Sequence, residues 1–64
     1  MRITLYHPKR EISLKGPKPV SSILTALSLQ KEAHLVICDD MLMTEDAMIA
    51  DDAVIEIRPV ISGG

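Results

Sequence analysis

The chain has 64 residues, a net charge of −2 and one cysteine, and these values exclude several classes of protein. A chain of this length forms one domain, and it buries only about 60% of the surface that its unfolded form exposes. Apolar residues make up 47% of it, which is typical of a globular chain. No intrachain disulfide is possible, no apolar run reaches the roughly 20 residues of a membrane span, and the start lacks the apolar region of a signal peptide. We therefore expect a cytoplasmic domain that does not enter a membrane.

The first half of the chain predicts a hairpin and then a helix. Apolar and polar residues alternate over residues 1–6 and 11–15, with a turn at Pro8 between them, which indicates two antiparallel strands. A helix is expected over residues 19–29, with Pro19 at its first position, where its missing N–H is tolerated. The apolar stripe of this helix recurs at three- and four-residue spacing in Val20, Ile23, Leu24 and Leu27.

The second half predicts three further strands. Residues 35–38 form an apolar run, residues 41–43 a short strand, and residues 54–60 an alternating strand. Asp39-Asp40 is expected to form a turn, because Asp tolerates left-handed backbone better than most residues. The polar segment that begins at Thr44 is read as a turn, with a single helical turn as an option. The resulting order, β-β-α-β-β-β, indicates an α+β roll with a mixed sheet and the helix on one face.

The strand phases assign a core and an exposed sheet face. The expected core consists of Ile3, Leu5, Ile12, Leu14, Val20, Leu24, Leu27, Leu35, Ile37, Leu42, Ile49, Ile55 and Ile57. If Leu35 and Ile37 point inward, their neighbour Val36 points outward, together with Glu56 and Arg58. An exposed face with these three residues at its centre is interpreted as a docking surface, although a scattered apolar residue on a surface is also ordinary.

Few residues in the chain can carry chemistry. It has no Cys/His spacing for zinc, no glycine-rich phosphate loop and no calcium loop, so we expect no catalytic residues and no metal or cofactor site. Cys38 is read as an ordinary strand residue. Tyr6 is the only aromatic residue, which counts against direct binding of nucleic acid. Residues 31–64 contain eight acidic and two basic side chains, which favours a basic protein partner or an ordinary solvated surface.

The last two residues, Gly63 and Gly64, are the most specific feature. Two glycines at these positions arise by chance in about 0.5% of chains. Glycine has no Cβ to clash with a narrow channel and can adopt every backbone region. A domain over residues 1–60 followed by a flexible tail over residues 61–64 can therefore thread a carboxylate into another protein, although a frayed end or a cloning remnant has the same composition.

This element order with a diglycine end resembles the ubiquitin-like β-grasp fold. More narrowly, residues 49–64 resemble the end of the ThiS/MoaD sulfur carriers. Within that family, residues 10–16, residues 42–46 and the ending 61–64 are most similar to the carriers that supply sulfur for 2-thiouridine in tRNA. Two positions depart from the family pattern. Asp52 stands at a usual turn glycine, where a left-handed conformation would cost about 1 kcal/mol, and Arg58 stands where MoaD-type carriers have an exposed aromatic residue.

The resemblance implies a carrier rather than an enzyme. An E1-like adenylyltransferase would activate Gly64 with its own ATP and Mg²⁺, after recognising Ile61, Ser62 and Gly63. A sulfurtransferase or cysteine desulfurase would then supply the sulfur of a C-terminal thiocarboxylate. A synthase or a tRNA thiolase would receive that sulfur, for tRNA 2-thiouridine or thiamine thiazole. The alternatives are a ubiquitin-like modifier joined to lysines through Gly64, a small subunit of molybdopterin synthase, and a passive β-grasp interaction module.

Overall fold

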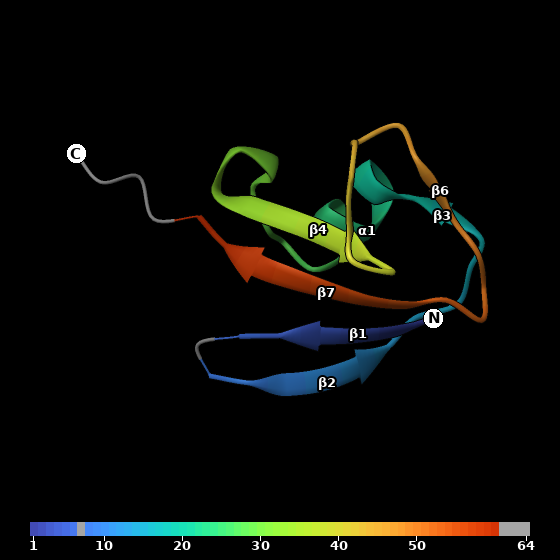
Figure 1. Ribbon diagram of the computed structural model, residues 1–64, viewed down its shortest axis with the longest axis horizontal. Helices are drawn as coiled ribbons and strands as arrows, with labels where there is room; N and C mark the ends of the chain where they lie inside the picture. Colours follow the sequence, from blue (N-terminus) through green and yellow to red (C-terminus); the bar gives the residue numbers. More distant parts are fainter. Residues whose placement is uncertain (7, 61–64) are drawn as a thin grey trace.

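The computed structural model describes residues 1–6 and 8–60, and all structural statements below refer to these residues. The elements along the chain are β1 (Arg2–Leu5), β2 (Arg10–Ser13), β3 (Lys18–Pro19), α1 (Val20–Ala26), the 3-10 helix η1 (Lys31–Ala33), β4 (His34–Cys38), β5 (Met41–Met43), β6 (Met48–Ile49) and β7 (Val54–Pro59). Figure 1 shows α1 on one side of the main sheet.

The main sheet has five strands in the order β2-β1-β7-β4-β5. β7 lies in its middle, parallel to β1 and antiparallel to β4, so the sheet is mixed. Together with the α-helix α1, this order is the ubiquitin-like β-grasp arrangement, and the predicted α+β fold is confirmed. The turn predicted after Thr44 is confirmed, since the amide of Ala47 donates to the carbonyl of Thr44 at 3.0 Å. The two-stranded pair β3–β6, whose second strand follows this turn, was not predicted. Strands of two residues carry too little alternation to be recognised in a sequence.

The helix is shorter than predicted at both ends. Pro19 is the N-cap in an extended conformation, with φ −71° and ψ 154°, and the first helical residue is Val20. At the other end Ser28 has φ 60°. The amide of Leu29 donates to the carbonyl of Leu24 at 2.9 Å and the amide of Ser28 to that of Thr25 at 3.1 Å. This pair of bonds is the Schellman arrangement, which ends the helix before the predicted residue 29.

The core lies between α1 and the inner face of the sheet. Its buried residues are Met1, Ile3, Leu5, Val20, Ile23, Leu24, Val36, Ile49, Ile55 and Ile57. Of the expected core, Ile12, Leu14 and Leu27 are partly buried against this cluster.

The predicted phase of residues 35–38 is wrong. Val36 is only 2% exposed, whereas Leu35 is 41% and Leu42 63% exposed, and Ile37 is half-buried. The cause is the pairing with β7, which places Val36 opposite the buried Ile57. Residues opposite one another on paired strands share a face of the sheet, so Val36 points inward and Leu35 points outward.

The two acidic turns, at Asp39-Asp40 and at Asp51-Asp52, differ in backbone conformation. The β4–β5 hairpin has a two-residue turn in which Asp39 has φ 52° and Asp40 has φ 64°. Two successive left-handed residues define a type I′ turn, and the predicted turn is confirmed. Asp52 has no positive φ. The backbone therefore avoids the left-handed cost that was expected at Asp52.

Truncating the two neighbouring residues of β4 tests this register. Val36→Ala should lower the free energy of unfolding by about 2 kcal/mol, because it removes two methyl groups from a fully buried side chain. Leu35→Ala should cost less than about 1 kcal/mol, since Leu35 lies on the solvent side. Equilibrium unfolding in urea measures both values. A larger loss for Leu35→Ala than for Val36→Ala would contradict the register.

Glycine substitution tests the turn conformations. Asp40→Gly should raise the free energy of unfolding by about 0.5–1 kcal/mol, because glycine adopts a positive φ without steric cost. Asp52→Gly is the matched control and should bring no gain, since position 52 does not use that region and glycine adds entropy to the unfolded chain. Thermal and urea unfolding of both variants measure these changes in the free energy of unfolding. An equal effect at the two positions would contradict the turn assignment.

Candidate functional site

The chain leaves the sheet at the end of β7, and this point is held in place by the neighbouring backbone. Pro59 lies opposite His34 in the β4–β7 ladder. One residue further on, the amide of Val60 donates to the carbonyl of Ala33 at 2.8 Å. The predicted tail residues Ile61, Ser62, Gly63 and Gly64 lie outside the described residues. The tail therefore begins next to η1, at the end of the molecule where β7 ends (Figure 1).

The sheet surface away from α1 is here called the outer sheet face. It contains Leu35, Ile37, Leu42, Val54, Glu56 and Arg58. Two of the three predicted docking residues, Glu56 and Arg58, lie on it. The expectation for Val36 is wrong, because Val36 is buried beneath the sheet. Leu35, which pairs with Arg58, and Leu42 are exposed, although both were expected in the core.

Arg58 belongs to a three-residue network that the sequence reading did not find. Its guanidinium carbon lies 4.6 Å from the centre of the Tyr6 ring, within the range of a cation–π contact. Arg58 Nε donates to a Glu56 carboxylate oxygen at 3.3 Å, and the Tyr6 hydroxyl donates to the other at 3.3 Å. These contacts are exposed or only partly buried, and they add little stability. They orient Arg58 on the outer sheet face, beside the base of the tail.

The network could have been anticipated only from the pairing of β1 with β7. Those strands run parallel, with Thr4 opposite Glu56 and Leu5 opposite Ile57, so the next residues on each strand, Tyr6 and Arg58, come together. The signal in the sequence is the alternation of Tyr6 and Arg58 with apolar neighbours. This alternation indicates a contact between Tyr6 and Arg58 only once the two strands are known to be adjacent.

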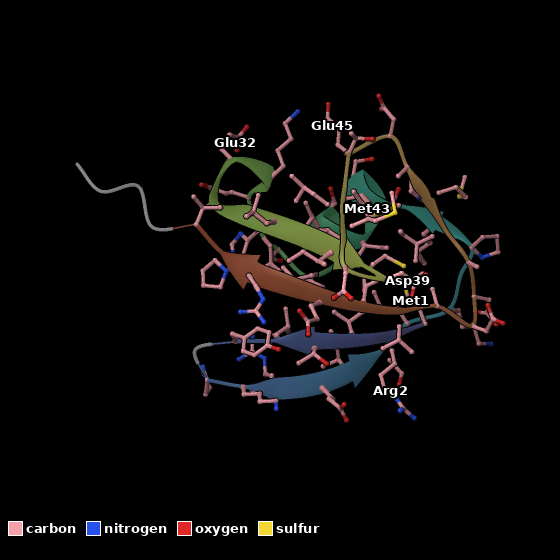
Figure 2. The ribbon with its side chains drawn as sticks, viewed as in Figure 1. Met1, Arg2, Glu32, Asp39, Met43 and Glu45 are labelled. Carbon is pink, nitrogen blue, oxygen red and sulfur yellow. The ribbon has the colours of Figure 1, made fainter. Side chains whose placement is uncertain are left out.

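The acidic turns lie at the other end of the sheet from the tail. β7 runs from Val54 to Pro59, and five steps of about 3.3 Å separate its ends by about 17 Å. Asp39 lies at the far end of β4, opposite its η1 end (Figure 2). Asp51 and Asp52 precede β7 and lie at its start. These carboxylates are therefore remote from the surface around Val60.

The described residues hold no candidate metal site, and the thiol of Cys38 is not activated. Among residues 1–6 and 8–60, no three His, Cys, Asp or Glu side chains are placed to hold a metal ion. Burial, with a smaller contribution from the negative charge of Asp39, raises the pKa of the Cys38 thiol. The thiol form is therefore favoured, and Cys38 is a poor nucleophile at neutral pH. Within the same residues, no helix has the length and hydropathy needed to cross a membrane.

Comparison with known proteins identifies a relative that matches over the whole chain. No protein-family model matches the chain. The chain is 31% identical to the sulfur carrier protein TtuB of Thermus thermophilus over an alignment of 65 positions, which covers 100% of both chains. An identity of this level over the complete length of both chains shows common family membership. The chain therefore belongs to the family of TtuB-like sulfur carrier proteins.

Proposed function

We propose that this carrier is activated at the carboxylate of Gly64 and delivers sulfur for tRNA 2-thiouridine. The observation that carries the proposal is the full-length similarity to TtuB, together with the Gly63-Gly64 ending that follows β7 by a few residues. The carrier would undergo the same activation and sulfur transfer if its sulfur were delivered to thiamine thiazole. The similarity to TtuB favours the tRNA pathway.

The carboxylate of Gly64 is a poor electrophile, so it has to be activated before sulfur can be attached to it. In the proposed sequence, an oxygen of the Gly64 carboxylate attacks the α-phosphorus of ATP on an E1-like enzyme, and pyrophosphate leaves. The terminal sulfur of a protein persulfide, formed by a sulfurtransferase or cysteine desulfurase, then attacks the carbonyl carbon and expels AMP. A second thiol cleaves the resulting acyl disulfide. That thiol is oxidised to a disulfide, and the carrier is released as a thiocarboxylate.

The fold contributes a rigid support for this reactive end. β7 is paired on both sides, by β1 and by β4, and the bond from Val60 to Ala33 sets where the tail begins. Each glycine that enters a partner's channel loses backbone freedom worth roughly 1–2 kcal/mol. Contacts on the folded domain have to offset that cost. We assign this role to the part of the outer sheet face nearest the tail, which includes Leu35, Glu56 and Arg58.

Changes at the two glycines test the activation step. Deleting Gly64 moves the carboxylate back by about 3.3–3.6 Å and should abolish ATP–pyrophosphate exchange with the cognate activating enzyme. Gly63→Ala adds a Cβ and restricts φ, so exchange should fall strongly while the free energy of unfolding stays within about 0.5 kcal/mol of the parent. Exchange and urea unfolding are measured on the same preparations.

Intact-mass measurement of the protein from its native cell separates the alternatives. A sulfur-for-oxygen mass shift is expected, and it should disappear when Gly64 is deleted. A branched peptide that joins Gly64 to a lysine would instead identify a protein modifier. Full exchange activity in the deletion variant would contradict the proposed function.

Charge reversal on the outer sheet face tests the docking surface. Arg58→Glu should raise the KM of the activating enzyme for the carrier by about tenfold, because it removes the cation–π contact and places two carboxylates side by side. Arg2→Glu is the matched control. It makes the same change on an exposed residue at the start of β1, remote from the tail. Equal KM values for Arg58→Glu and Arg2→Glu would exclude a role of Arg58 in docking.

A further inference from the structure

An apolar groove of about 370 Å³ lies at one edge of the sheet, between α1, η1, β4 and the chain that follows β5. Its apolar lining comes from Val20, Leu24, Leu35, Val36, Leu42 and Met43. Lys31 Nζ and a Glu45 carboxylate oxygen form an ion pair of 2.8 Å at its rim. Three of the lining residues, Glu32, Met43 and Glu45, are labelled in Figure 2.

The groove exists because β4 is longer than its edge partner. β5 ends at Met43, opposite Val36, so the first two residues of β4 have no β5 residue opposite them. After Met43 the chain turns toward the helix. The amide of Ser21 donates to the carbonyl of Glu45 at 3.0 Å, and the amide of Val20 to that of Ala47 at 2.9 Å. This detour leaves the sheet edge open, so that the exposed side chains of Leu35 and Leu42 border a floor formed by the buried residues Val20, Leu24 and Val36.

The groove lies beside the base of the tail. Val60 is bonded to Ala33, and the residues on either side of Ala33, Glu32 and His34, line the groove. Gly64 lies four residues beyond Val60, and four residues span at most about 14 Å even when fully extended. The active site of an enzyme that holds the Gly64 carboxylate therefore lies within about 14 Å of Val60, on the side of the molecule that carries η1 and the start of β4.

We propose that this groove receives an apolar side chain of the activating enzyme while that enzyme holds the tail. The inference rests on the proposed function and adds a second contact surface to it. Leu35 and Leu42 belong both to the groove and to the outer sheet face, so one partner can cover the two surfaces without a break. The charge of Lys31 is already balanced by Glu45. The lining is mainly apolar, so it favours an aliphatic or aromatic group over a charged one.

The pairing of the rim residues persists at neutral pH. The hydrogen bond and the negative charge of Glu45 raise the pKa of Lys31 above its ordinary value, so the ammonium stays protonated. Both side chains remain about half exposed. The ion pair between Lys31 and Glu45 therefore lies at the rim of the groove and leaves the groove open to solvent.

Substitutions at Thr44 test the groove without disturbing the core, since Thr44 is an exposed residue of its lining. Thr44→Trp should fill the groove, and Thr44→Asp should place a charge in it. The same two substitutions at Thr25, an exposed residue of α1 outside the groove, are the matched controls. ATP–pyrophosphate exchange is measured against carrier concentration, and thermal unfolding is followed in parallel.

Both Thr44 variants should raise the KM for the carrier at least tenfold with kcat within about twofold of the parent, and both Thr25 variants should match the parent. A parental KM for both folded Thr44 variants would overturn the groove assignment while leaving the proposed function intact. A parent chain that supports no exchange would overturn the proposed function, and the groove assignment with it. The comparison of Thr44→Trp with deletion of Gly64, which should remove exchange altogether, separates lost docking from lost chemistry.

Discussion

The placement of β7 between β1 and β4 is the constraint on which the rest of the molecule depends. β7 is the one strand of the sheet that connects its two hairpins, parallel to β1 on one side and antiparallel to β4 on the other. Its buried residues Ile55 and Ile57 form the centre of the core, and its exposed residues Glu56 and Arg58 form the centre of the outer sheet face. Because the same strand leads into the tail, the core that stabilises the fold also sets where the tail begins.

A carrier protein has to offer its partner a reactive end and a surface that identifies it. Around Val60, the last residue that the structure describes, lie Arg58 on Tyr6, the exposed Leu35 and the groove beside η1. The acidic turns at the other end of the sheet are separated from this region by the length of β7. In the proposed function, the activating enzyme docks on this small, mostly apolar area beside the oriented Arg58, and the net negative charge acts only at longer range.

Much of the fold was predictable from the sequence. Which residues lie on each face of a strand was predictable only where apolar and polar residues alternate. Residues 54–59 alternate apolar and polar side chains, and their phase was assigned correctly. Residues 35–38 are Leu-Val-Ile-Cys, all apolar, and a run of this kind has no period that distinguishes its two faces. The assignment of Val36 to the docking surface failed for this reason. The pair β3–β6 was missed because two residues cannot show a period, and the network of Tyr6 with Arg58 was missed because it joins residues 52 positions apart.

The sequence by itself determined the order of the main elements, the turn at Asp39-Asp40, the position of the helix stripe and the diglycine ending, because each of these follows from local spacing or from the conformations that single residue types allow. Only the tertiary structure decided which side of β4 faces the core, where the outer sheet face carries its cation, and that a groove opens beside the tail. These features depend on strand register and on the unequal lengths of β4 and β5. Register is set by pairing between segments far apart in the chain, and a shift of one residue exchanges the two faces of a strand.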